Sequence, residues 1–219
     1  MFKRLITLFK LGRKLAKSDA LTIVSKFNKP PLLVTVIFKL LSFSFTKKDR
    51  SYDNLSEGEK LSNSLASMGT TFIKLGQFLA TRPDIIGDGL SKELESLQDK
   101  LPPFSQSKAK EMIRNDLGDE IYNSIINISE PVAAASIAQV HKAQIDDNGV
   151  IKDVAIKILR PDIKKIFNEE VDALMLFAFI IESLIKKTKR LKLVEVVFLL
   201  KEITSLEMDL RFEAAAANE

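Results

Sequence analysis

The hydrophobic and polar positions of this 219-residue chain predict mostly helices, interrupted by one short region of strands. Apolar residues recur every three or four positions in several segments, which is typical of helices that bury one face. Helical regions are predicted at 56–80, 90–98 and 108–116, and again after residue 162. Proline pairs at 30–31 and 102–103 separate these regions, and Leu117-Gly118 is a helix stop.

The strand region is predicted to begin at Pro131. Residues 132–145 and 150–159 are rich in β-branched and alternating apolar positions, enough for about three antiparallel strands. The turn residues Asp146-Asp147-Asn148-Gly149 lie between them, as a hairpin requires. We therefore predict an α+β fold that is mostly helical and contains a short antiparallel sheet.

Composition excludes several kinds of chemistry. The chain has no cysteine and one histidine, so disulfides, thiolate catalysis and a zinc site are not expected. Its net charge of +4 is modest. Nucleic-acid binding is not expected either, because no stripe of Lys and Arg accompanies a recognition motif or interleaved aromatic residues.

The positive charge is concentrated near the N-terminus, where six cations precede the first acidic residue, Asp19. They are Lys3, Arg4, Lys10, Arg13, Lys14 and Lys17. Phe2, Leu5, Ile6 and Phe9 recur at helical spacing, with most of the cations on the other side. This pattern predicts an amphipathic helix on an anionic membrane surface, although docking onto the protein itself or a targeting segment are alternatives. No stretch reaches the roughly 20 apolar residues of a membrane span.

Two segments in the strand region have the form of a nucleotide site. The first consists of eight consecutive residues: Ala133, Ala134, Ala135, Ser136, Ile137, Ala138, Gln139 and Val140. With glycine at 133, 135 and 138 it would read G-x-G-x-x-G-x-V, the phosphate loop of protein kinases. The second is Val154-Ala155-Ile156-Lys157, the form of the kinase strand whose lysine reaches the α- and β-phosphates.

Alanine in place of glycine changes what the loop can do. Glycine allows positive φ angles and lets backbone N–H groups close over phosphate oxygens, whereas alanine largely forbids those angles. The loop is therefore expected to be stiffer and to alter nucleotide preference without abolishing binding. The alternative interpretation is a small-residue packing patch followed by an ordinary buried strand, but the two segments together favour a nucleotide site.

Further motifs bring the whole chain close to a known family. Residues 71–84 contain K-x-G-Q as Lys74, Gly76 and Gln77, and 97–103 contain L-Q-D-x-x-P-P. The alanine segment runs on to His141, and Glu207-Met208-Asp209 has the form E-x-D. Nearly the entire chain resembles the UbiB/ADCK atypical kinases in the identity, order and spacing of these motifs.

The resemblance implies a function and a location. That family is implicated in ubiquinone (coenzyme Q) biosynthesis and has a kinase-like fold that uses ATP or ADP with Mg²⁺, more as an ATPase than as a protein kinase. It implies that Lys74 and Gln77 gate the nucleotide cleft, with Glu207 and Asp209 turned toward them. Expected partners are nucleotide, a membrane surface and quinone-biosynthesis proteins. The expected location is cytoplasmic and peripheral to the inner membrane, or the matrix side in a mitochondrion.

The strand lysine of a kinase needs a carboxylate to orient it. The resemblance favours Glu213 as the partner of Lys157, while spacing places Asp209 and Glu213 on one face of a single helix. A solvated acidic helix face is the alternative.

The sequence holds no H-R-D, D-F-G or equivalent motif, so no catalytic residue and no metal ligand is predicted. We expect three parts: interfacial helices at 1–50, a helical K-x-G-Q extension at 51–130, and an incomplete kinase-like small lobe at 131–219. The chain is expected to be a truncated or split N-terminal part, completed by a polypeptide that carries the other lobe. Whether it is an enzyme stays open, and a catalytically silent module that binds nucleotide or a subunit at the membrane is the alternative.

Overall fold

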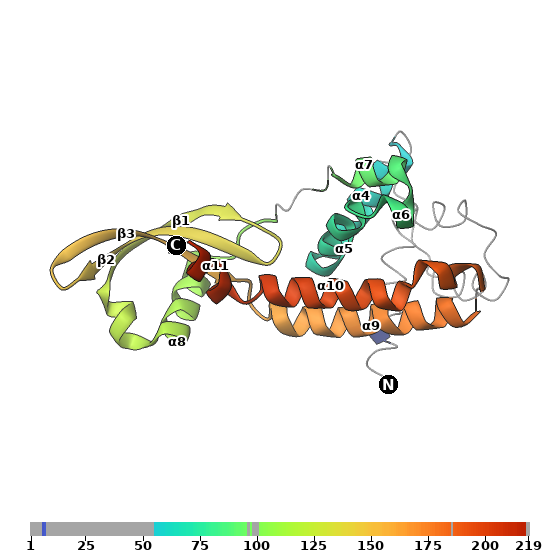
Figure 1. Cartoon of the computed structure of the whole chain (residues 1–219). Helices are drawn as coiled ribbons and strands as arrows, with labels where there is room; N and C mark the ends of the chain where they lie inside the picture. The colour runs from blue at the N-terminus through green and yellow to red at the C-terminus, as the bar shows by residue number, and fades with distance from the viewer. Residues whose placement is uncertain (1–5, 8–54, 96, 98–100, 185, 218–219) are drawn as a thin grey trace. The chain divides into compact units, whose positions relative to one another are not determined.

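A computed structural model describes residues 6–7, 55–95, 97, 101–184 and 186–217 of the chain (Figure 1). These residues form two compact units, and the chain passes from one to the other more than once. The first unit holds the residues up to 97 and 164–207, and the second holds 101–163 and 208–217. The predicted N-terminal amphipathic helix lies outside the described residues, apart from Ile6 and Thr7. The predicted three-part division stays a prediction.

The first unit begins with four helices: α4 (Glu57–Met68), α5 (Thr70–Ala80), α6 (Pro83–Ile86) and α7 (Asp88–Glu95). A capping box starts α4, since the Ser56 side chain accepts the Glu59 N–H while the Glu59 carboxylate accepts the Ser56 N–H. The predicted helical region 56–80 is two helices because Gly69 lies between them at φ 107°, an angle that favours glycine.

The same unit contains a helical hairpin formed by α9 (Ile163–Leu184) and α10 (Leu193–Glu207), joined by the 3-10 helix η2 (Lys186–Leu191). The Glu182 carboxylate accepts the Val194 N–H at 3.0 Å, which satisfies a donor at the start of α10. The connection between the two helices is thus fixed by a side chain as well as by η2.

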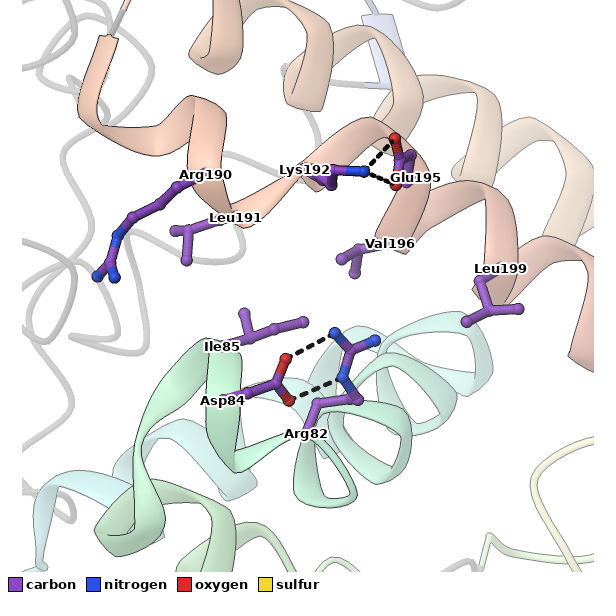
Figure 2. A pocket seen from close by; sticks show the side chains of 9 residues that line it. All are labelled: Arg82, Asp84, Ile85, Arg190, Leu191, Lys192, Glu195, Val196 and Leu199. Carbon is purple, nitrogen blue, oxygen red and sulfur yellow. Dashed lines mark hydrogen bonds and ion pairs between the residues drawn. The ribbon is translucent and has the colours of Figure 1, made fainter.

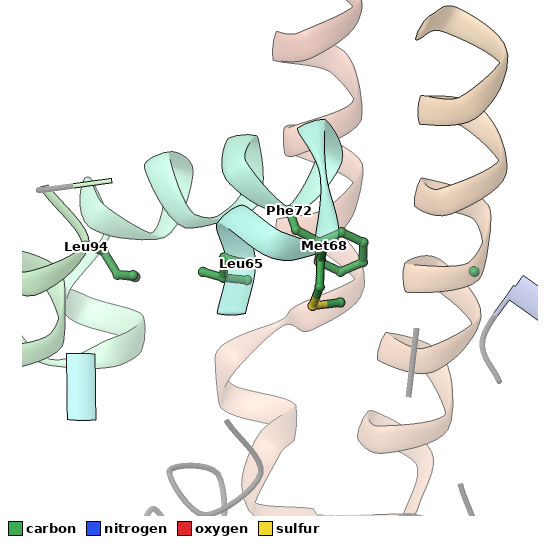
Figure 3. Close-up of a cluster of buried hydrophobic side chains, with 5 residues drawn as sticks. Leu65, Met68, Phe72 and Leu94 are labelled. Atoms are coloured by element: carbon green, nitrogen blue, oxygen red, sulfur yellow. The ribbon is translucent and has the colours of Figure 1, made fainter. Parts of the chain in front are cut away.

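The core of the first unit brings the extension helices and α9 together. Leu65 and Met68 of α4, Phe72 of α5, Leu94 of α7 and Ala173 of α9 form one buried cluster, most of which is drawn in Figure 3. Each of these side chains is at most 5% exposed, so the apolar faces predicted from their spacing are the buried ones.

Gly76 of α5 is packed too closely for a side chain. A Cβ atom at this position would lie 2.5 Å from a methyl carbon of Leu97 and 2.9 Å from one of Leu65. The glycine of K-x-G-Q therefore allows Leu97 and α4 to approach α5, and any larger residue must displace these leucines.

The second unit is built on a three-stranded antiparallel sheet in the order β1-β2-β3. The strands are β1 (Ile125–Ala134), β2 (Ala138–Asp147) and β3 (Val150–Leu159). Asn148 and Gly149 both have positive φ between the paired residues Asp147 and Val150, as the tight turns of two-residue hairpins require. The predicted hairpin and the α+β fold are confirmed. The first strand starts at Ile125, six residues before the predicted start at Pro131. Pro131 lies inside β1 at a register shift of this edge strand, a position where proline is tolerated.

Helix α8 (Gln106–Ser124) packs against all three strands. Ala109 and Ile113 of α8 form a buried cluster with Ile158 of β3. The predicted stop at Leu117-Gly118 is a kink, because Gly118 has φ 80° and the helix resumes after it. A last short helix, α11 (Leu210–Ala216), completes this unit.

Within the described residues, no helix combines the length and the apolar character that crossing a bilayer needs.

The packing at Gly76 gives a stability prediction. Gly76→Val is expected to lower the free energy of unfolding by about 1–3 kcal/mol, because its methyl groups meet Leu65 and Leu97. Gly89→Val is the matched control, since nothing lies within 4 Å of a Cβ at that helical position. It should change stability by no more than about 0.5 kcal/mol. Urea unfolding followed by circular dichroism measures both, and equal midpoints would contradict the close packing.

Candidate functional site

The alanine segment forms the turn between β1 and β2. Ala133 and Ala134 end β1, Ala138 starts β2, and the Ala135 N–H donates to the Ala138 carbonyl at 2.8 Å across the turn. No residue from 133 to 140 has a positive φ. The turn is therefore closed by backbone angles that alanine accepts. Its stiffness stays a prediction.

Lys157 lies on β3, directly opposite Val140 of β2. Val140 in turn pairs with Ala133 of β1. Ala133, Val140 and Lys157 therefore lie side by side in one row across the sheet. The Lys157 side chain is 34% exposed. The sheet register thus brings the two segments of the predicted nucleotide site together.

The Lys157 ammonium donates to the Glu213 carboxylate, with 2.5 Å between Nζ and Oε2. Glu213 lies on α11 and its side chain is 60% exposed, so this is a surface ion pair of modest strength. The pair is the one that the resemblance favours.

Asp209 lies outside the helix that carries Glu213. Helix α10 ends at Glu207, and Asp209 has φ −96° and ψ 85° as the N-cap of α11. Its carboxylate accepts the Arg211 N–H and pairs with the Arg211 guanidinium, which raises the pKa of Arg211. The expectation that Asp209 and Glu213 share one helical face is wrong, because Asp209 bonds to the backbone of the following turn and ends the helical geometry.

Gln139 and His141 make a buried polar network on one face of β2. Both side chains are 0% exposed. The Gln139 amide oxygen accepts the Phe104 N–H at 3.0 Å, and its amide nitrogen donates to the Phe104 carbonyl at 3.3 Å. In this orientation the Gln139 amide nitrogen donates to His141 Nε2 at 2.9 Å, so Nε2 is an acceptor. The other ring nitrogen, Nδ1, therefore carries a hydrogen and donates to the Ser129 carbonyl at 2.7 Å.

Arg160 is a residue that the sequence analysis did not single out. Its guanidinium donates to three backbone carbonyls: Ala135 through Nε at 2.9 Å, Pro102 through Nη1 at 3.0 Å and Leu101 through Nη2 at 3.3 Å. The available signal was an arginine at the end of the lysine strand, since arginine has five donors in a rigid fork.

In the first unit, Lys74 of α5 pairs with Glu207 of α10 at 2.8 Å between Nζ and Oε2. The Lys74 side chain is only 13% exposed, so this ammonium is largely removed from water while its partner stays accessible. Gln77 lies one turn further along α5 and is half-buried. The gating role of these residues and of Asp209 stays a prediction.

A hollow of about 190 Å³ lies in the first unit between the end of α5, α6, η2 and α10 (Figure 2). The Arg82 guanidinium makes two hydrogen bonds to the Asp84 carboxylate, at 2.8 and 2.7 Å, and this lowers the pKa of Asp84. Lys192 is likewise paired with Glu195, and both lie on the α10 side of the hollow. Most of the charge that lines it is thus neutralised in pairs.

Adenine nucleotide and Mg²⁺ fit the described residues to different degrees. Lys157 and the alanine turn suit a polyphosphate, which needs a cation and oriented backbone groups. Among the residues that the structure describes, no group of three acidic or histidine side chains could hold a metal ion.

Comparison with known proteins agrees with the motifs. Residues 96–219, more than half of the chain, match the ABC1 atypical kinase-like domain. A protein of Marinobacter nauticus named "Probable protein kinase UbiB" is 37% identical over 166 residues, which cover 75% of this chain and 30% of that protein. The protein of the same name from Shewanella pealeana is 34% identical over 189 residues, covering 86% of this chain and 34% of its own length.

A third protein of that name, from Tolumonas auensis, is 37% identical over 167 residues, or 76% of this chain and 30% of that protein. The chain spans about a third of the length of these curated relatives. The domain match covers the segment that contains the alanine turn, Lys157 and Glu213, and the chain belongs to the ABC1 atypical kinase-like family.

Proposed function

We propose that this chain binds ATP or ADP at the alanine turn and Lys157, as the nucleotide-binding part of an atypical kinase or ATPase that supports ubiquinone biosynthesis. The observation that carries the proposal is that Lys157 pairs with Glu213 and lies in the same row of the sheet as Ala133 and Val140. A kinase-type site needs these groups together, because the lysine meets the α- and β-phosphates while a carboxylate keeps its ammonium oriented.

Each part of the site would have its own role in binding the phosphates. Lys157 neutralises phosphate charge, and Glu213 holds its ammonium in place through a bond that is too exposed to resist exchange with a phosphate. The turn from 133 to 140 covers the phosphates with backbone N–H groups, within the range of angles that alanine allows. Mg²⁺ would shield the phosphates, and we assign it no ligand among the described residues.

The link to ubiquinone and the gating role rest on the family and its motifs. We propose that Lys74, Gln77, Glu207 and Asp209 control access to the nucleotide. The Lys74–Glu207 pair, whose lysine is largely removed from water, supports a fixed arrangement of α5 against α10, which such a gate requires. Peripheral membrane attachment is proposed from the basic amphipathic pattern of residues 2–17.

The first test compares two lysines of the same strand. Lys157→Ala is expected to weaken Mg-ADP binding at least about tenfold, because a charged contact to phosphate is lost. Lys152→Ala is the control, since Lys152 is also on β3 but pairs with Asp147 near the hairpin turn. Calorimetry measures both with the 219-residue chain alone. A second arm adds the part of the Marinobacter nauticus relative that the chain does not cover. Failure of the unmodified chain to bind in both arms would overturn the proposal.

The second test reverses the orienting charge. Glu213→Lys places an ammonium beside Lys157, so Mg-ADP affinity should fall by roughly three- to tenfold, as expected for losing a partly exposed ion pair. Glu202→Lys makes the same change at an exposed position of α10. Unchanged affinity in Glu213→Lys would show that the pair has no role in nucleotide binding.

The third test concerns the membrane. Replacing Lys10, Lys14 and Lys17 by alanine should weaken co-sedimentation with phosphatidylglycerol vesicles about 100-fold, at about 1 kcal/mol for each cation near the surface. The control replaces Lys92, Lys142 and Lys152, which have the same total charge and lie on exposed positions. If both triple variants lose the same amount of vesicle binding, the effect comes from net charge and not from the N-terminal segment.

A further inference from the structure

One arginine joins the alanine turn to a segment of the chain more than 30 residues before it. We call residues 101–104 the strap. Arg160 donates to Leu101 and Pro102 of the strap and to Ala135 of the turn through the three nitrogens of its guanidinium. Its own backbone N–H donates to the Ile137 carbonyl at 2.8 Å. A single residue thus holds two carbonyls of the turn and two of the strap.

These contacts fix the direction of a peptide plane in the turn. The peptide bond is planar and all described peptide bonds are trans, so the Ala135 carbonyl and the Ser136 N–H point in opposite directions. Because Arg160 holds the Ala135 carbonyl, it also determines where the Ser136 N–H points. The backbone N–H groups of such a turn are the groups that meet phosphate oxygens.

The strap is held from a second side by Gln139. The Gln139 amide makes two hydrogen bonds to the backbone of Phe104, and Gln139 is itself 0% exposed. Gln139 is the second residue of β2, directly after the turn. The strap and the turn are therefore joined by two side chains. Their hydrogen bonds are partly buried, apart from the exposed bond between Arg160 and the Pro102 carbonyl, and a partly buried bond is costly to leave unmade.

We propose that Arg160 is a positioning residue for the nucleotide loop, which it holds in its binding geometry by anchoring the turn to the strap. The proposal rests on the proposed nucleotide site, because it states how the turn of that site is kept in shape. Arg160 does not touch the nucleotide in this arrangement. Its effect passes through the carbonyl groups of the turn and the strap.

The geometry requires arginine and not merely a positive charge. Three nitrogens of one planar group reach three separate carbonyls, and the rigid fork keeps their spacing. A lysine has one nitrogen at the end of a flexible chain, so it can satisfy the charge but not hold both segments at once. Arg160→Lys therefore separates the anchoring role from the charge.

The first measurement is amide hydrogen exchange of the 219-residue chain without nucleotide. In Arg160→Lys, exchange in peptides covering 134–138 is expected to become about tenfold faster, as loss of bonds to a charged donor implies. Arg114→Lys is the control, because Arg114 is exposed on α8 and pairs with Asp119. Unchanged exchange of the turn in Arg160→Lys would overturn the anchoring.

The second measurement is Mg-ADP affinity of the same variants, under the conditions in which the unmodified chain binds. Affinity should fall about tenfold in Arg160→Lys and stay unchanged in Arg114→Lys. Faster exchange with unaltered affinity would overturn the positioning role. If the unmodified chain does not bind nucleotide while exchange responds as expected, the proposed function fails and the anchoring by Arg160 stands.

A second variant protects the test against misfolding of Arg160→Lys. Pro102 and Pro103 are exposed, so replacing both by alanine keeps the carbonyl acceptors and leaves the core intact while freeing the strap backbone. Exchange of the turn is expected to rise by roughly two- to fivefold, less than in Arg160→Lys, because the bonds weaken without being removed. No change in the turn after loosening the strap would contradict the coupling between the two segments.

Discussion

The second unit depends on one requirement: polar side chains on the inner face of β2 are fully buried and must find hydrogen-bond partners. Gln139 and His141 occupy positions where a sheet packed on a helix would ordinarily carry apolar residues. Their partners are backbone groups of Phe104 and Ser129, which are thereby fixed against the sheet. Arg160 extends the same principle to the turn. The alanine turn is thus held by hydrogen bonds to its flanks and not by packing alone.

Two of the lysine–glutamate pairs, Lys74–Glu207 and Lys157–Glu213, differ in how exposed they are to water. Lys74 is 13% exposed, so breaking its bond to Glu207 would leave a poorly solvated ammonium. Lys157 is 34% exposed and its partner 60%, so water can replace either group with little loss. The first pair is suited to holding helices together. The second is suited to a cation that must exchange one anionic partner for another.

Much of this arrangement could be predicted from local patterns. The Asn148-Gly149 turn, the strand alternation and the lysine strand are local signals, and the structure has each of them. The break between Glu207 and Glu213 could not be predicted from spacing, because it depends on whether Asp209 caps a helix or continues one. The contacts of Arg160 were equally hidden, since they join residues 58 and 59 positions apart through backbone atoms that have no sequence signature.

The groups that receive these hydrogen bonds are main-chain atoms, which every residue possesses. Leu101, Pro102 and Ala135 contribute only a carbonyl oxygen to Arg160, and Ser129 only a carbonyl to His141. The side chains at the receiving positions can therefore diverge in evolution without breaking the bonds. The donors cannot, because no other side chain reproduces the arginine fork. Asparagine has the paired donor and acceptor of glutamine but is one methylene shorter. Replacing Arg160, Gln139 or His141 therefore removes hydrogen bonds of this network, whereas a receiving residue can be replaced without losing its acceptor wherever the backbone keeps its conformation.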